Sequence, residues 1–163
     1  MRQNILNVAI NKLGVKEDPP GSNRQEFGAW FGFNDAEWCG IFCSYCYSFG
    51  GHPLGILDFY KGFASVPFAY NHYKNLPNND GSLRITKNPL TSDLVLFDWN
   101  KDGSPDHVGL FEKWIDKDKG AFSTIEGNTS INNQSNGGEV MRRERSMYYV
   151  HSFINPLNLP PDA

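Results

Sequence analysis

Cysteine is scarce in this chain. The chain has 163 residues, and its three cysteines, Cys39, Cys43 and Cys46, all lie in one short stretch. At helical pitch they fall along one stripe, so they cannot readily pair with one another. The odd count and the short spacing exclude a disulfide framework and fit a protein made in a reducing compartment.

Long apolar runs and excess charge are also missing. No segment is apolar for long enough to cross a bilayer, and residues 1–14 lack the apolar core of a signal peptide. The formal net charge of −3 gives no reason to expect nucleic acid as a partner. We therefore expect synthesis in the cytoplasm without a signal peptide, no membrane partner, and one monomeric domain over residues 1–163.

The first half of the chain predicts helices. Apolar residues at helical spacing or suitable end signals indicate helices over 2–13, 24–33, 39–49 and 65–75. Asn34 and Asp35 are candidate N-caps for the cysteine-bearing helix, and Gly50 is a stop signal after it. Ser65 is a candidate cap for the last of the four.

The second half predicts strands. The near-continuous apolar run over 93–99 indicates a buried strand. Four further segments complete a predicted antiparallel meander, at 107–114, 121–127, 139–146 and 148–154. Helices followed by strands are typical of an α+β fold, with N-terminal helices packed on a C-terminal antiparallel sheet.

Three chemically useful side chains occupy favourable places in this layout. Cys39 opens its helix, and a thiol there is activated by the helix dipole and by a neighbouring imidazolium. If 107–114 and 121–127 pair around the turn at 115–120, His107 lies opposite Glu126 or Asn128. Strand alternation puts both candidates on the same side as the histidine and points Gly127 away.

These parts are typical of a cysteine hydrolase. Cys39 would be the nucleophile and His107 the acid–base group, with Glu126 holding the imidazole and Asn128 as a second candidate for that role. The backbone N–H of Cys39 is a natural oxyanion donor, and the Asn34 side chain is a candidate for the second. Cys43 and Cys46 sit among aromatic and aliphatic residues, which predicts buried apolar fillers.

Five segments, in this order, carry a resemblance to a known family. They are PPGSN (19–23), WFGFNDAEWC (30–39), DLVLFDWNKDGSPDHVGLFE (93–112), TIEGNTS (124–130) and GGEVMRRER (137–145). The chain resembles the CHAP family, the cysteine, histidine-dependent amidohydrolases/peptidases that cleave peptidoglycan. The resemblance covers most of the chain and departs from the family at Cys43, where an aliphatic residue is expected.

The resemblance implies a papain-like fold and an amide-cleaving enzyme without a cofactor. Its substrate would be bacterial peptidoglycan, cut in the stem or cross-bridge peptide or at the muramyl–alanine amide. A phage lysin and an antibacterial effector both fit, acting on the wall or in the periplasm after release or secretion, and an effector would have an immunity protein as partner. The candidate substrate contacts are Ser22, Asn23, Trp30, Asn34 and Trp38.

Two other functions compete with this interpretation. The spacing Cys39-x₃-Cys43-x₂-Cys46 also matches the iron–sulfur motif of radical S-adenosylmethionine enzymes, although here it lies in an amphipathic helical run of a short chain. A non-catalytic wall-binding or inhibitor module on the same scaffold could use exposed aromatic residues such as Trp30 and Trp38 to stack on the wall.

A weak calcium signature precedes His107. Asp98, Asn100, Asp102 and Asp106 match the acidic spacing of a calcium loop, with Gly103 at its glycine position. The twelfth position is Gly109 instead of the bidentate glutamate. A polar turn between two strands explains the same residues, and we expect no metal.

Overall fold

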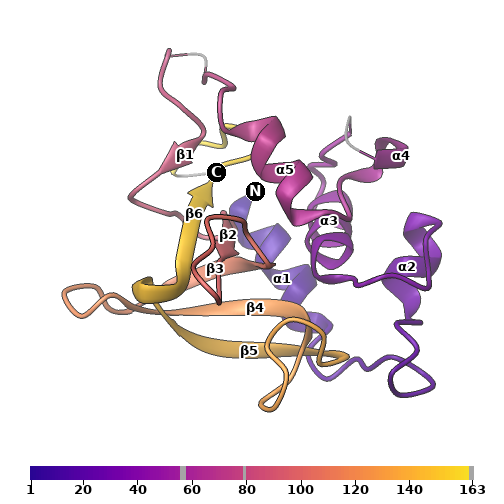
Figure 1. Cartoon of the computed structure of the whole chain (residues 1–163). Helices are drawn as coiled ribbons and strands as arrows, with labels where there is room; N and C mark the ends of the chain where they lie inside the picture. The colour runs from indigo at the N-terminus through magenta and orange to yellow at the C-terminus, as the bar shows by residue number, and fades with distance from the viewer. Residues whose placement is uncertain (56–57, 79, 162–163) are drawn as a thin grey trace.

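The computed structural model describes residues 1–55, 58–78 and 80–161. Figure 1 shows helices followed by a sheet, as the sequence predicts. The helices are α1 (Arg2–Asn11), α2 (Glu26–Phe31), α3 (Cys39–Phe49), α4 (Asp58–Lys61), α5 (Val66–Tyr73) and the short 3₁₀ turn η1 (Met147–Tyr149). The strands are β1 (Ile85–Thr86), β2 (Leu94–Phe97), β3 (His107–Asp116), β4 (Ala121–Thr129), β5 (Glu139–Ser146) and β6 (Val150–Ile154). The α+β class is confirmed.

The sheet has the strand order β1-β6-β2-β3-β4-β5, and all its neighbouring strands are antiparallel. Strands β2 to β5 form the predicted meander. The expectation that the last strand continues it is wrong, because β6 crosses back to pair with β2 and β1. Period-two alternation identifies a strand but not its neighbour, and the turn η1 redirects the chain between β5 and β6.

The two faces of the sheet have different cores. On one face, aliphatic residues such as Leu94, Leu96 and Ile125 pack against the helices. On the other face, Phe97 and Phe122 belong to a smaller aromatic cluster. Successive residues alternate between these faces, so the face that a strand residue occupies can be read from its neighbours.

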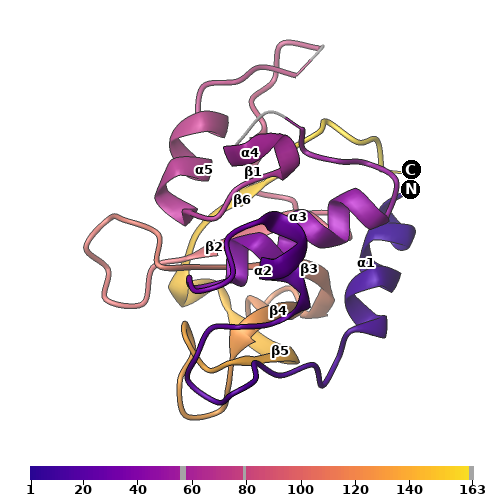
Figure 2. The ribbon, with the colours of Figure 1, turned by 90° about the vertical axis from the view of Figure 1, so that its right-hand side faces the viewer.

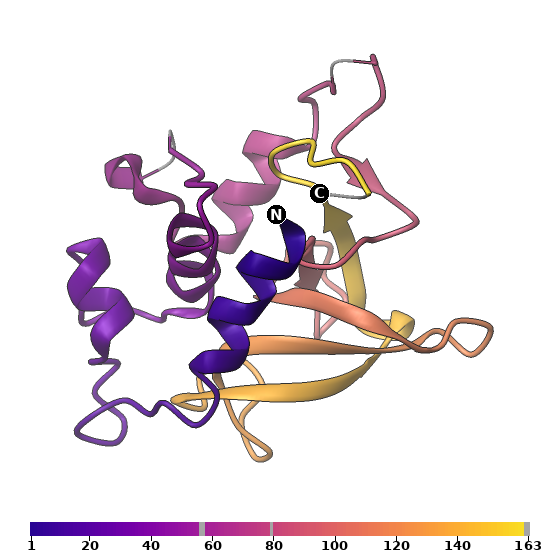
Figure 3. The ribbon, with the colours of Figure 1, turned by 180° about the vertical axis from the view of Figure 1, so that it is seen from behind.

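Helix α3 is the centre of the helical layer. It contacts α1, α2, β3 and β4. Figure 2 shows α2 in front of α3, with the sheet behind, and Figure 3 shows α1 lying across the strands. All of its residues from Cys39 to Tyr47 are buried. Gly40 is needed in its first turn, since a Cβ there would lie 2.8 Å from the Phe63 ring. No helix in the described part of the chain combines the length and apolar content needed to span a bilayer.

Candidate active site

Cys39 is the first residue of α3. The N-cap is Trp38, whose side chain makes no capping hydrogen bond, so the expectation that Asn34 or Asp35 caps this helix is wrong. Asn34 instead turns toward the start of α2 and accepts from the Gln25 N–H at 3.0 Å. No side chain of the N-cap residue therefore accepts from the first-turn amides of α3. The positive end of the helix dipole lies at this turn, which carries the Cys39 sulfur.

His107 and Glu126 form a buried pair. The imidazole Nε2 lies 2.8 Å from Oε1 of Glu126, and both side chains are fully buried. An ionised carboxylate only accepts hydrogen bonds, so Nε2 carries the proton and donates it. The other ring nitrogen, Nδ1, is buried and has no partner of hydrogen-bond geometry among the described residues. In the neutral ring, Nδ1 is thus an available proton acceptor.

Cys39 lies next to this imidazole. Burial by itself lowers the pKa of His107, but the nearby Cys39 sulfur and the Glu126 carboxylate, which favour the charged ring, outweigh burial and raise it to about 9. A raised histidine pKa means that the imidazolium is the favoured form at neutral pH. A positively charged ring beside a thiol is the electrostatic setting that makes a cysteine nucleophilic.

Gly109 makes the His107–Glu126 contact possible. The β3–β4 register pairs Leu110 with Ile125, which places Gly109 opposite Glu126. A Cβ at position 109 would lie 2.5 Å from Cγ of Glu126. The glycine therefore leaves room for the glutamate to lean diagonally toward His107. Gly127 faces the other way, toward Phe42 of α3, as strand alternation predicts.

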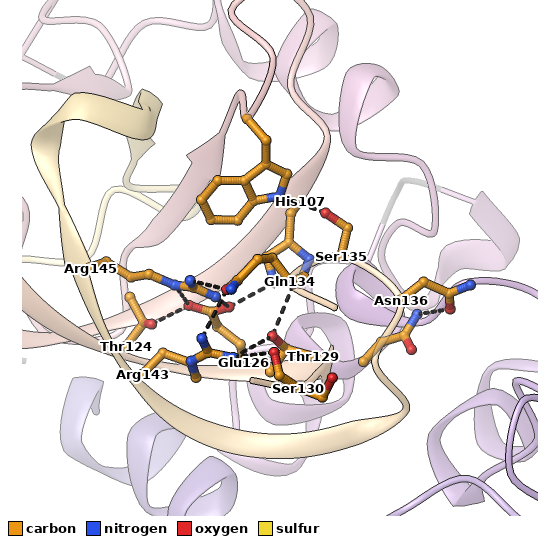
Figure 4. Close-up of polar contacts among 12 residues, drawn as sticks. His107, Thr124, Glu126, Thr129, Ser130, Gln134, Ser135, Asn136, Arg143 and Arg145 are labelled. Atoms are coloured by element: carbon orange, nitrogen blue, oxygen red, sulfur yellow. Dashed lines mark hydrogen bonds and ion pairs between the residues drawn. The ribbon is translucent and has the colours of Figure 1, made fainter. Parts of the chain in front are cut away.

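Arg145 completes the surroundings of Glu126, and the sequence analysis missed it. Its guanidinium binds both carboxylate oxygens, and the Thr124 hydroxyl donates to one of them (Figure 4). Burial raises the pKa of Glu126, but Arg145 and His107 outweigh burial and lower it to about 2. A β4–β5 hairpin register would have placed Arg143 and Arg145 on the Glu126 face, so pairing these two strands by sequence could have found the contact.

Asn128 has other partners. Its side chain donates to Asn136 at 3.0 Å and accepts from the Gly138 N–H at 3.1 Å. Its backbone has a φ of 57°, so the strand bends here and the side chain is turned into the following loop. The structure therefore gives Asn128 a role in holding residues 130–138 rather than the His107 ring, and the expectation that it assists His107 is not supported.

The candidate substrate contacts divide into two groups. Trp38 is fully buried, and its indole donates to Glu17 at 3.3 Å, so it belongs to the core and the expectation of substrate contact is wrong. Trp30 is partly exposed and packs edge-on against Tyr45. Ser22 and Asn23 are partly exposed in the loop before α2. As substrate contacts, Trp30, Ser22, Asn23 and Asn34 remain predictions.

The acidic segment before His107 is tied to its own backbone. Asp98 accepts from the Gly103 N–H at 2.8 Å, Asp102 from the Ser104 N–H at 2.9 Å, and Asp106 from the Trp99 N–H at 2.8 Å. Asn100 donates to Asp102. Within the described ranges, no three metal-binding side chains of the His, Cys, Asp or Glu type converge. These bonds explain the acidic spacing as a set of turns.

Cys43 and Cys46 differ from Cys39 in their surroundings. Both are fully buried, and burial raises the pKa of each thiol well above its usual value. All three cysteines are free. The helix places Cys43 and Cys46 inside the core, where they act as apolar fillers. A cysteine stripe on a buried helix is not the geometry of a loop that wraps around an iron–sulfur cluster.

The fold resembles that of a known lytic enzyme. One solved structure, titled as a wild type endolysin, LysIME-EF1, aligns with 98% of this chain at a TM-score of 0.56 and 13% sequence identity. This chain spans 64% of that chain. No protein-family model matches the sequence, and no curated protein matches it. The likeness establishes a fold shared with an endolysin.

Proposed function

We propose that this chain is a cysteine-dependent hydrolase that cleaves an amide bond in bacterial peptidoglycan. The observation that carries the proposal is the buried His107–Glu126 pair, 2.8 Å apart, beside a thiol at the start of a helix. The fold shared with an endolysin supports the wall as the substrate. The five segments that resemble the CHAP family support the same substrate class.

The arrangement supports a two-step mechanism. The Cys39 sulfur attacks the amide carbonyl carbon, forming a carbon–sulfur bond, while Nδ1 of His107 holds the proton that the thiol has lost. The imidazolium then gives this proton to the departing amine as the carbon–nitrogen bond breaks. In the second step His107 takes a proton from water, which attacks the thioester and releases the acid and the free thiol.

Glu126 would keep the ring in the orientation that this cycle needs. Its carboxylate accepts from Nε2, so proton exchange takes place at Nδ1. The charge on Glu126 also stabilises the imidazolium that forms during attack. The backbone N–H of Cys39, at the uncapped start of α3, would donate to the oxyanion of the tetrahedral intermediate.

The remaining expectations form part of the proposal. Residues 1–163 would form one catalytic domain that acts on the wall after release or secretion. The bond cut would lie in the stem peptide, in the cross-bridge or at the muramyl–alanine amide. Mass spectrometry of the fragments released from purified wall distinguishes these bonds, because each cut frees a different new amine.

The test compares three proteins on purified peptidoglycan. Wild type and Cys46→Ala should release soluble fragments, while Cys39→Ala should release none. Cys46→Ala is the matched control because it removes a thiol from the same helix at a fully buried position. Equal release by Cys39→Ala and wild type would contradict the nucleophile. Binding to the wall without release by any of the three would favour a non-catalytic module.

A further inference from the structure

Besides His107, the Glu126 carboxylate binds one guanidinium, that of Arg145. Arg145 Nε lies 2.8 Å from Oε2 of Glu126, and Nη2 lies 2.5 Å from Oε1. The arginine side chain is only 7% exposed. A fork that binds both oxygens fixes the plane of the carboxylate as well as its charge, which a single contact cannot do.

Aromatic rings cover this arginine. The guanidinium carbon lies 5.3 Å from the Phe97 ring centre and 4.9 Å from that of Trp99. The two rings are themselves stacked, 4.8 Å apart and nearly parallel. Apolar cover of this kind excludes water, so the attraction between Arg145 and Glu126 is weakly screened.

The loop after β4 holds the arginine from the opposite side. The amide oxygen of Gln134 accepts from Arg145 and also from Arg143, at 2.9 Å for the latter (Figure 4). Arg143 is further bound to the Ser130 backbone oxygen at 2.6 Å. The second guanidinium is thus kept on the loop, and the carboxylate of Glu126 is left to Arg145.

We propose that Arg145 is a positioning residue that sets the plane and the charge of Glu126 and, through it, the orientation of the His107 ring. Because Oε1 of Glu126 is shared between His107 Nε2 and Arg145 Nη2, any rotation of the carboxylate away from the fork also breaks its contact with the ring. The inference rests on the Cys39–His107–Glu126 part of the proposed function and not on the identity of the substrate.

A surface pocket makes this role testable by chemical rescue. A pocket of about 490 Å³ is lined by Arg145 together with Trp99, Gln134 and Tyr149. Truncation of Arg145 would therefore leave a space that solvent can reach from this pocket. A free guanidinium ion has the shape and charge of the missing group and should bind Glu126 in its place.

The experiment measures how fast iodoacetamide alkylates Cys39 at neutral pH, with the modified residue identified by mass spectrometry. This readout needs no peptidoglycan, so its outcome is separate from that of the wall-cleavage test. Arg145→Ala should alkylate roughly tenfold more slowly than wild type, because a disoriented imidazole no longer activates the thiol. Guanidinium chloride at a low, non-denaturing concentration should recover most of the loss, whereas sodium chloride at equal ionic strength should not.

The matched control is Arg142→Ala. Arg142 is on the same strand but on the opposite face, where it pairs with Glu112 and its side chain is 46% exposed. Its removal should leave the rate unchanged, with or without guanidinium. Circular dichroism establishes that each variant is folded.

Three results would overturn the proposal. One is a folded Arg145→Ala whose alkylation rate equals that of wild type. Another is slow alkylation of Arg145→Ala that guanidinium does not speed up, together with equally slow alkylation of Arg145→Lys. That pattern indicates a general structural role. Should Arg145→Ala not fold, Arg145→Lys replaces it as the decisive variant. Lysine keeps the charge but lacks the fork, so a rate equal to wild type would contradict positioning by the fork.

Discussion

The first turn of α3 and the interior of the same helix both present cysteine to the sheet, and the surroundings of these thiols differ. Cys39 lies beside a charged network of His107, Glu126 and Arg145. Cys43 and Cys46, one and two turns further on, lie in the apolar core, where burial raises the pKa of their thiols. The comparison teaches that position along the helix, not the residue type, decides whether a thiol here meets charged groups or only apolar ones.

The largest expected effect is at the first turn. Cys39→Ser should lower wall cleavage by roughly 1000-fold or more, since a hydroxyl is a far weaker nucleophile beside the same imidazole. The fold should persist, because the exchange is nearly isosteric. Release of soluble fragments measures the activity, and circular dichroism measures the fold. Activity near that of wild type would contradict the claim that Cys39, unlike Cys43 and Cys46, is the nucleophile.

A smaller loss should follow from crowding Glu126. Gly109→Ala places a Cβ where Cγ of Glu126 lies only 2.5 Å away, so the carboxylate must move off His107. We expect a fall in kcat of roughly 10- to 100-fold. Gly127→Ala is the interior counterpart, because its Cβ would meet Phe42 of α3, also at 2.5 Å. Both variants should lose stability, so kcat is compared at a temperature where both are folded. There, Gly127→Ala should lower kcat less than Gly109→Ala does. The opposite order would contradict the account.

The charged network should also make stability depend on pH. The pKa of His107 is raised from 6.5 to about 9, so its contribution is fully present below pH 6.5 and is lost as the pH rises through about 9. We expect the free energy of unfolding to fall by an amount on the order of 3 kcal/mol over this window. Urea titrations of wild type and His107→Gln measure the difference. A variant with the same pH slope as wild type would contradict the assignment.

The smallest effects are expected in the helix interior. Cys43→Ala and Cys46→Ala each remove a small group from the core and should lower the free energy of unfolding by roughly 1–2 kcal/mol. Wall cleavage at a temperature where both variants are folded should stay at the wild-type level. Urea denaturation measures the loss of stability, and the release of soluble fragments measures wall cleavage. Loss of cleavage by a fully folded Cys46→Ala would show that the interior thiols take part in the chemistry.

Local patterns predicted most of the elements, though not α4 or β1, and much of the candidate site. The helix from Cys39 to Phe49, the β3–β4 hairpin and the shared face of His107 and Glu126 all follow from short-range periodicity. These features depend on residues that lie close in sequence or on one hairpin register. That is why they could be derived without coordinates.

The features that sequence reasoning missed depend on long-range neighbours. The place of β6 beside β2 joins segments that are far apart in the chain, and alternation cannot choose between sheet edges. The Arg145 contact to Glu126 required the β4–β5 register as well as the β3–β4 register. Trp38 appeared available for substrate because its burial depends on Phe27 and the Glu17 acceptor, which come from other elements.

The most direct test of the account is the rate at which iodoacetamide alkylates Cys39 in wild type and in His107→Asn at neutral pH. The account predicts that Cys39 is labelled before Cys43 and Cys46, and that the His107 substitution slows this labelling by roughly tenfold or more. Equal rates for the two folded proteins, or first labelling at an interior cysteine, would contradict the claim that Cys39 and His107 act together.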